Sequence, residues 1–274
     1  MVRIVVVLVC ALMAVPSAQE SLADAARRKT LDLILDTYVR DGEVYYRALK
    51  ADRAKLDGYL NLLGGAAVDK LPREERLAFW INAYNAAVMK TVIDHYPIHG
   101  RAADYPANSI RQIPGAFDKL AHRVGGRSVT LDQIEQTILT EFHDPRVYLA
   151  LGRGALGGGR LRSEAFTPQR VEAQLTEVAN ECPSRMQCVG VDRENGVVQA
   201  SPIFSWRERE FVAAYADKAP RAFNERSPIE RAVLAFIRPK LLTIEKEFVD
   251  KNTFRVAFST FDWSLNDLTG RGGR

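Results

Sequence analysis

The chain has 274 residues, of which 47% are hydrophobic and 26% charged, proportions that are ordinary for a globular protein with one large domain or two small ones. The formal net charge is +4, but basic and acidic residues are mixed along the chain and no long block of like charges occurs. No basic-aromatic motif is present either, so the sequence argues against a nucleic-acid partner.

The first residues have the pattern of a secretory signal peptide over residues 1–18. Arg3 supplies a positive charge, residues 4–15 form an apolar run, and we expect cleavage after Ser17 or Ala18. The run is too short for a spanning helix, which needs about 20 apolar residues, and no later run approaches that length. We therefore expect an exported protein, periplasmic or secreted, with no membrane span after cleavage. An uncleaved N-terminal anchor is the alternative.

The remaining elements follow from periodicity, caps and turn residues. Helices are predicted, in chain order, over residues 19–40, 52–63, 72–95, 130–141, 169–180, 208–216 and 227–238. Extended pieces are predicted beside a tight turn at 124–129, over 146–151, in a hairpin over 189–199, and over 254–258. Thr130 and Ser227 each begin a capping box, and Asn195-Gly196 is typical of a type I′ turn. Residues 98–119 read as a long irregular loop, and residues 268–274 as a disordered tail.

The predicted helix over 72–95 organises the rest of the chain. Its middle part, residues 77–90, is apolar almost all round, so we expect it to be buried at the centre. Asn82 and Asn85 are three residues apart and therefore lie on one face of it. Because an unpaired buried amide costs about 1–3 kcal/mol, some other segment must dock against that face.

The cysteines indicate the redox environment. After signal cleavage only Cys182 and Cys188 remain, separated by five residues. In an oxidising compartment so close a pair favours one disulfide, worth about 2–3 kcal/mol for a short loop. The alternatives are a redox pair, which usually has two intervening residues, or a pair of metal ligands, for which no His cluster lies near.

No internal repeat and no shift in composition marks a domain boundary. We expect one domain over residues 41–267, following the N-terminal helix, of helix-rich α+β class with a small, mainly antiparallel β-sheet. Residues 204–206 are expected in its core, and residues 262–266 are expected to anchor the C-terminus on that core.

The motif Phe79-Trp-Ile-Asn-Ala-Tyr-Asn-Ala86 resembles the hallmark helix of the domain-of-unknown-function 547 family. Further pieces resemble the family in the same order, at residues 41–49, 131–139, 146–151, 161–166 and 261–266. The resemblance covers roughly residues 40–267, nearly all of the mature chain. It implies membership of this family but carries little information on activity.

One segment departs from the family pattern. Relatives usually read like Asn-Cys-Ala-Ser-x-Ser-Cys-Pro after Ala-Leu, whereas residues 152–159 here contain no Cys, and Arg153 and Gly158 stand at the thiol positions. Relatives also often carry His near Gln136 and Tyr148, which replace it here. Any thiol–imidazole chemistry of relatives therefore does not carry over, because a guanidinium is neither a nucleophile nor a general base at neutral pH.

Three arginines, Arg153, Arg160 and Arg162, accompany the glycine-rich loop at residues 152–159. Backbone N–H groups and guanidinium groups together suit a carboxylate or phosphate, so this stretch is a candidate anion site. The alternative is a tight loop whose arginines pair with Glu164 and other carboxylates of the protein.

Polar residues elsewhere are weaker candidates. Asn82, Tyr84 and Asn85 either position a ligand or water, or hydrogen-bond the backbone of the irregular loop at 98–119 or of the glycine-rich loop. Glu135 and Glu164 either act as general acid and base or have structural roles, which for Glu135 include capping a loop or pairing with Arg146. Pro97 interrupts the only helically spaced His pair, so no metal and no cofactor is expected.

Three hypotheses on function follow. The first is an exported binding module for an anionic small molecule, a peptide or an envelope glycan, in which the Arg/Gly-rich loop faces the central helix. The second is a hydrolase-like enzyme that uses Glu135 or Glu164 together with Arg153. The third is a scaffold or partner-binding protein without a pocket, which a structure with no hollow between the central helix and this loop would favour.

Overall fold

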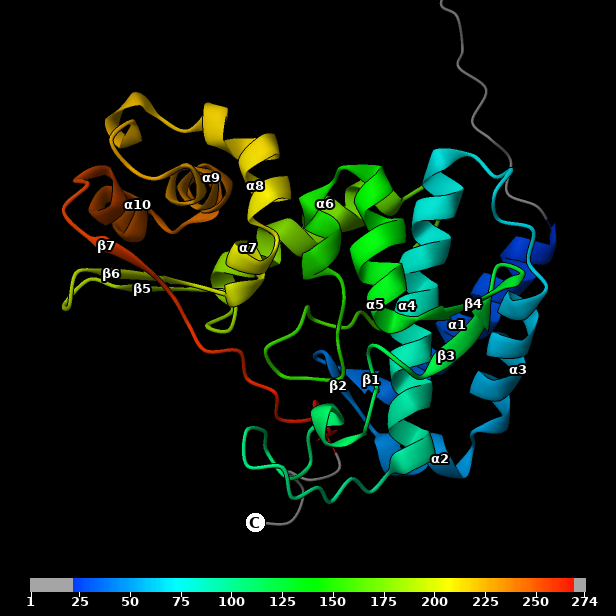
Figure 1. Ribbon diagram of the computed structural model, residues 1–274. Coiled ribbons are helices and arrows are strands. Elements are labelled where there is room, and N and C mark those ends of the chain that lie inside the picture. Colours follow the sequence, from blue (N-terminus) through cyan, green and yellow to red (C-terminus); the bar gives the residue numbers. More distant parts are fainter. Residues whose placement is uncertain (1–21, 269–274) are drawn as a thin grey trace, which may run out of the picture.

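The computed structural model describes residues 22–268. The predicted signal peptide, residues 1–18, lies outside the described residues, as does all of the predicted tail except Leu268. The helices are α1 (Leu22–Tyr38), α2 (Tyr46–Ala51), α3 (Ala54–Gly64), α4 (Arg73–His95), α5 (Leu131–Gln133), α6 (Val171–Glu181), α7 (Pro202–Trp206), α8 (Glu208–Tyr215), α9 (Pro228–Ile237) and α10 (Thr243–Asp250) (Figure 1). The strands are β1 (Val39–Arg40), β2 (Glu43–Val44), β3 (Ala121–Val124), β4 (Arg127–Thr130), β5 (Val189–Asp192), β6 (Val197–Ala200) and β7 (Arg255–Phe258).

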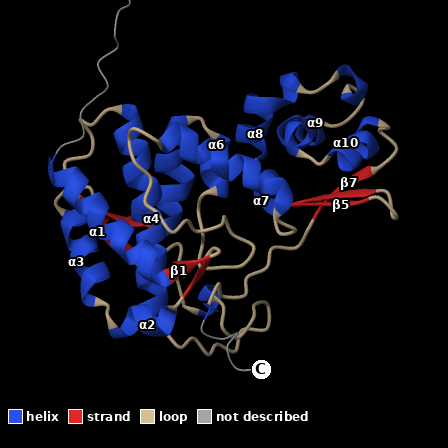
Figure 2. Cartoon of the chain, turned by 180° about the vertical axis from the view of Figure 1, so that it is seen from behind, coloured by secondary structure: helices blue, strands red, loops and turns tan. Residues whose placement is uncertain are grey.

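The strands form small, separate sheets (Figure 2). Strands β1 and β2 form one antiparallel pair, β3 and β4 another, and β5 pairs antiparallel with β6, which in turn pairs parallel with β7. Helices make up most of the remaining regular structure. The predicted helix-rich α+β class with mainly antiparallel pairing is therefore confirmed.

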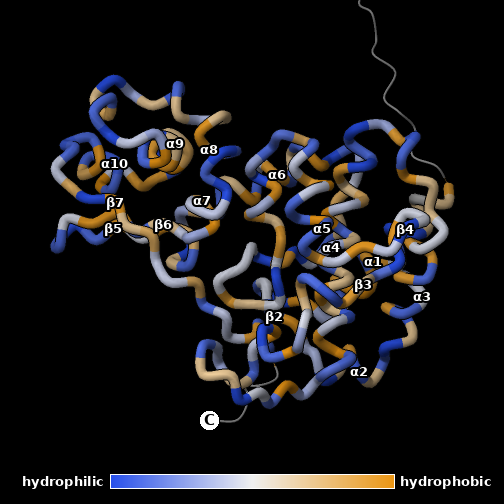
Figure 3. The backbone as a smooth tube through the Cα atoms, in the orientation of Figure 1, coloured by the Kyte–Doolittle hydropathy of each residue, from blue (hydrophilic) through white to orange (hydrophobic). Residues whose placement is uncertain are grey.

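Helix α4 is the centre of the first half of the molecule. From Leu77 to Ile93 only Phe79 and Lys90 are not fully buried. Helices α2, α3 and α6 and the helical segment 131–142 pack around it, and Figure 3 shows hydrophobic positions along its length. Because burying one large apolar side chain contributes about 1.5–3 kcal/mol, packing stabilises this helix far more than intrinsic propensity does.

Residues 189–258 form a second body beside the first (Figure 1). There the β5–β7 sheet and helices α7 to α10 enclose an aromatic core, in which the Phe204 ring lies 4.6 Å from that of Phe211 and 5.6 Å from that of Phe236, centroid to centroid. The chain then returns to the first half, where Leu265 pairs with Ala155 in an isolated β-bridge. The predicted anchoring of the C-terminal motif on the core is confirmed.

A disulfide closes the short connection between α6 and β5. It joins Cys182, directly after α6, to Cys188, directly before β5, with 5.2 Å between the two Cα atoms. Both cysteines are buried. The disulfide predicted from the spacing is therefore confirmed.

The predicted strand over residues 146–151 is wrong. Residues Pro145–Leu149 form a 3₁₀-helix, in which Pro145 occupies the first turn. The Asp144 carboxylate caps this helix by accepting a hydrogen bond from the Arg146 N–H group at 3.0 Å. The cap and the proline thus prevail over the β-propensity of the Val-Tyr-Leu run.

The hairpin over 189–199 is confirmed, but its predicted type I′ turn is wrong. Asp192 pairs with Val197, so four residues form the connection instead of two. Only Gly196 of the Asn-Gly pair has positive φ, at 64°. The Asp192 carboxylate accepts hydrogen bonds from the Asn195 N–H and side-chain amide, at 2.9 and 2.7 Å, and these contacts hold the longer turn.

Candidate functional site

The glycine-rich loop, residues 152–159, is fastened to α4 through Asn85. The Asn85 amide donates to the Ala150 carbonyl at 3.1 Å and accepts from the Gly152 N–H group at 2.9 Å. Glycine is needed at 158, since a Cβ there would lie 2.1 Å from the Gly152 carbonyl oxygen. The loop is therefore folded tightly on itself and held against the central helix.

Asn82 holds a second segment on the same face of α4. Its amide donates to the Phe166 carbonyl at 2.8 Å and accepts from the Phe166 N–H group at 2.9 Å. In both Asn82 and Asn85 the side-chain amide therefore donates one hydrogen bond to the backbone and accepts one from it. Asn85 contacts the glycine-rich loop, as its structural alternative predicted, whereas Asn82 contacts the segment that follows the loop.

Arg153 lies inside the protein, opposite Glu135. Its side chain is 3% exposed and that of Glu135 is 8% exposed, with 2.5 Å between the closest nitrogen and oxygen atoms. The guanidinium also donates to the carbonyls of Tyr148 and Leu151, at 3.0 and 3.1 Å. The Tyr84 hydroxyl donates to Glu135 at 3.0 Å, and burial, reinforced by that carboxylate, raises the pKa of Tyr84 well above its ordinary value. Internal partners therefore occupy the polar groups of all three side chains.

Arg207 forms a neighbouring buried cluster that the sequence did not predict. It donates to the Gln136 side chain and to the Tyr148 hydroxyl, its guanidinium lies 3.8 Å from the centroid of the Tyr148 ring, and it pairs with Glu210 at 2.8 Å. Arg207 thus joins the two positions near which relatives often carry His. No motif surrounds it, and an arginine directly after an apolar run was the only available signal.

The helical turn that carries Glu135 and Gln136 explains their different partners. Residues Ile134–Ile138 form a π-helical turn between α5 and a 3₁₀ turn, and such turns are frequent at functional sites. Here Glu135 meets Arg153, while the next residue meets Arg207. Arg146, which the sequence offers as a partner for Glu135, pairs instead with Asp144 and Glu172.

Glu135 and Glu164 do not share a reaction centre. Among the described residues, Glu164 contacts Arg162, Arg170 and Gln174, and none of these touches Glu135. The two segments also meet different sides of α4. Tyr84, which contacts Glu135, leaves the helix about 200° away from Asn82, which holds the segment next to Glu164. This geometry offers no single substrate position for the two carboxylates.

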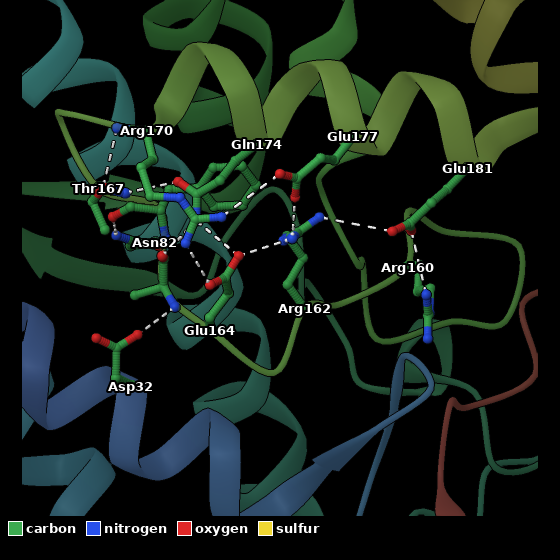
Figure 4. A network of polar contacts seen from close by, with 12 residues as sticks. Asp32, Asn82, Arg160, Arg162, Glu164, Thr167, Arg170, Gln174, Glu177 and Glu181 are labelled. Atoms are coloured by element: carbon green, nitrogen blue, oxygen red, sulfur yellow. Dashed lines mark hydrogen bonds and ion pairs between the residues drawn. The ribbon is translucent and has the colours of Figure 1, made fainter.

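Arg160 and Arg162 line an open hollow of about 310 Å³. Arg160 pairs with Asp41 at 2.8 Å and with Glu181 at 3.4 Å. Arg162 pairs with Glu164 at 2.8 Å, and Figure 4 shows that Glu181 contacts both arginines. The walls come from the β1–β2 turn, residues 160–164 and the end of α6. This hollow therefore lies beside the glycine-rich loop, and not between that loop and α4, where the binding-module hypothesis placed the site.

The charges in this hollow are well defined at neutral pH. Partial burial raises the pKa of Glu164, but hydrogen bonds from Arg162 and Gln174 outweigh it, so the pKa lies below its ordinary value. Burial lowers the pKa of Arg162, and its bonds with Glu164 and Glu177 more than restore it. Glu164 is therefore an anion, which suits an ion-pair partner better than a general acid.

Within residues 22–268, no group of three or more His, Cys, Asp or Glu side chains is arranged to hold a metal ion. In the same part of the chain, no helix has both the length and the apolar character needed to cross a membrane.

Comparison with known proteins identifies one family. Residues 68–181 match the family model described as "Protein of unknown function, DUF547". This match contains α4, the glycine-rich loop and α6, and it ends one residue before the disulfide. No curated protein and no solved structure matches the chain.

Proposed function

We propose that this chain, which belongs to the DUF547 family through its residues 68–181, is an exported binding module that holds an anionic ligand between Arg160 and Arg162. The observation that carries this proposal is the hollow of about 310 Å³ with both guanidinium groups on its wall. A guanidinium presents a planar fork of donors that matches a carboxylate or a phosphate.

The Asp41 partner of Arg160 is easily displaced. The side chain of Asp41 is 91% exposed and that of Arg160 is 39% exposed. Ion pairs this exposed contribute about 0–1 kcal/mol, because water solvates both partners well. An incoming anion can therefore take the place of Asp41 on Arg160 at little cost.

The buried residues have a supporting role in this proposal. Asn85 holds the glycine-rich loop against α4, Arg153 fixes it to Glu135, and Asn82 holds the segment at Phe166. Arg160 and Arg162 lie between these two fixed points. Their backbone is thereby preorganised, which reduces the entropy lost on binding.

Export is part of the same proposal. The apolar N-terminal run supports it from the sequence, and the Cys182–Cys188 disulfide supports it because disulfides persist in oxidising compartments. Fractionation of cells that express the full chain tests it, with the cleaved protein expected outside the cytoplasm.

Titration calorimetry with inorganic phosphate and with citrate tests the binding site. Arg160→Ala and Arg162→Ala should each weaken binding about tenfold or more, which corresponds to about 1.4 kcal/mol. Asp41→Asn should strengthen binding, because it removes the competing carboxylate while Asn tolerates the positive φ of 51° at that position.

Arg209→Ala on α8 is the matched control, since Arg209 is exposed and does not line the hollow. It should bind both anions like the unmodified protein. The proposal fails if Arg160→Ala and Arg209→Ala bind equally well, or if neither anion binds the unmodified protein.

A further inference from the structure

A second hollow, of about 200 Å³, lies near the first and has a different lining. The Phe261 ring forms part of its apolar wall, and its polar groups are the side chains of Gln187, Ser259, Thr260 and Asp262. It is smaller than the roughly 300–1,000 Å³ of a pocket for a drug-sized ligand. One ring with several hydroxyl groups is a suitable size for it.

A narrow crevice connects the two hollows. It shares Arg160 and Glu181 with the first, and Gly157 and Gln187 with the second. Its own volume is about 10 Å³, close to the minimum for one water molecule. The arginines of the first hollow and the polar side chains of the second therefore lie along one surface, with the crevice between them.

Arg185 lies in this crevice and lacks a strong partner. Among the described residues it has no ion pair, and its side-chain hydrogen bond goes to the Gly158 carbonyl at 3.4 Å. Burial, followed by the charge of Arg160, lowers the pKa of Arg185, and Glu181 opposes this effect. A weakly satisfied guanidinium beside Arg160 adds to the positive charge that favours an anion at Arg160.

The second hollow, at Asp262, suits the hydroxyl groups of a ligand. One oxygen of the exposed Asp262 carboxylate accepts from the Ser264 N–H group at 2.9 Å, and a carboxylate can accept further bonds but donate none. The ligand atoms at this end are therefore neutral donors, since an anion would be repelled.

An exposed aromatic side chain adjoins this end. Trp206 was expected in the core, but it is 48% exposed, and one face packs on Phe261 with 4.9 Å between ring centroids. Trp263 stacks at 6.3 Å from it. An aromatic ring held in this way offers an amphipathic platform to the flat face of another ring.

We propose that the anionic ligand is a sugar that carries a carboxylate or a phosphate. The acidic group binds Arg160 and Arg162 in the first hollow, where Arg185 adds positive charge, the ring hydroxyls bind Gln187 and Asp262, and an apolar face of the sugar packs on the exposed Trp206 ring. This inference rests on the proposed function, since it assumes the anion site at Arg160.

Titration with four probes tests the inference: galacturonic acid, neutral galactose, glucose 6-phosphate and inorganic phosphate. Galacturonic acid or glucose 6-phosphate should bind about tenfold more tightly than inorganic phosphate, a gain of about 1.4 kcal/mol. Since both acidic sugars have one ring, whichever binds more tightly identifies the acidic group as carboxylate or phosphate. Galactose should bind more weakly than galacturonic acid.

Trp206→Ala and Asp262→Asn should remove that advantage and leave the affinity for inorganic phosphate unchanged or slightly higher. Leu242→Ala, which truncates another exposed apolar side chain, is the control and should change neither affinity. The inference is overturned if both variants keep the full advantage, or if a tetraglutamate peptide binds with the same dependence on Asp262. In either case phosphate binding that depends on Arg160 would leave the proposed function standing, whereas loss of all binding would refute both.

Discussion

Replacing Arg153 by Met should strongly destabilise the protein without directly affecting the anion site. The substitution removes two hydrogen bonds to Glu135, at 3.2 and 2.5 Å, and two to the carbonyls of Tyr148 and Leu151. It leaves the 8% exposed Glu135 carboxylate with Tyr84 as its remaining hydrogen-bond partner. Breaking a buried pair from one side costs about 3–5 kcal/mol, because the remaining charge stays desolvated.

Urea unfolding followed by tryptophan fluorescence measures this loss. Since domains of this kind are stable by about 5–15 kcal/mol, Arg153→Met should still fold but unfold at much lower urea concentration. Adding Glu135→Gln to Arg153→Met removes the isolated charge and keeps an acceptor for Tyr84. The double variant should therefore lose about 2–3 kcal/mol less than the sum of the two single losses.

The reasoning on Arg153 would be refuted by a loss below about 1 kcal/mol in Arg153→Met, a value typical of surface ion pairs. It would also be refuted if the folded variant kept its stability but lost phosphate binding. That result would make Arg153 a ligand-binding residue and would reverse the roles assigned to Arg153 and Arg160.

Three further results are expected. Asn82→Ala should cost about 1–3 kcal/mol for each of the two Phe166 backbone groups that it leaves buried and unpaired. Replacing Cys182 and Cys188 together by Ala should cost about 2 kcal/mol, because the disulfide closes a loop with a sequence separation of only 6. Burial lowers the pKa of His122 below 6.5, so between the two pKa values the unfolded chain binds more protons than the folded protein. The free energy of unfolding should therefore fall as the pH falls through 6.5. His122→Gln should flatten that pH dependence.

Each of these three expectations has a control variant or an outcome that would contradict it. Asn61→Ala, on an exposed position of α3, should cost less than about 0.5 kcal/mol, and an equal effect of Asn82→Ala would contradict the docking role. Unchanged stability in the double Ala variant of the cysteines would contradict the disulfide argument. For the pH dependence, His99→Gln is the exposed control, and equal slopes in it and His122→Gln would contradict the assignment.

Local features of the fold were predictable because their causes are local. The boxes at Thr130 and Ser227 cap helical segments as predicted, with Gln133 and Glu230 as their partners. Helix α4 followed from its apolar run, and the disulfide from its spacing. The failures at residues 146–151 and at the hairpin turn came from side chains, those of Asp144 and Asp192, that capture backbone groups a few residues away.

The candidate site was less predictable because long-range contacts create it. The sequence predicts that Asn85 needs a partner, but that partner, Gly152, lies 67 residues further along the chain. Arg153 and Arg160 looked equivalent in the sequence, yet one is buried against Glu135 and the other lies on an open wall. The cluster around Arg207 depends on a contact with Tyr148 over 59 residues, which no local pattern encodes.

A crystal structure of the full mature chain with inorganic phosphate tests the central claim most directly. The account predicts phosphate within hydrogen-bonding distance of the Arg160 and Arg162 guanidinium groups, with Asp41 displaced from Arg160. It also predicts that Arg153 keeps its contacts with Glu135. Phosphate bound to Arg153, or an Arg160–Asp41 pair that is unchanged at saturating phosphate, would contradict it.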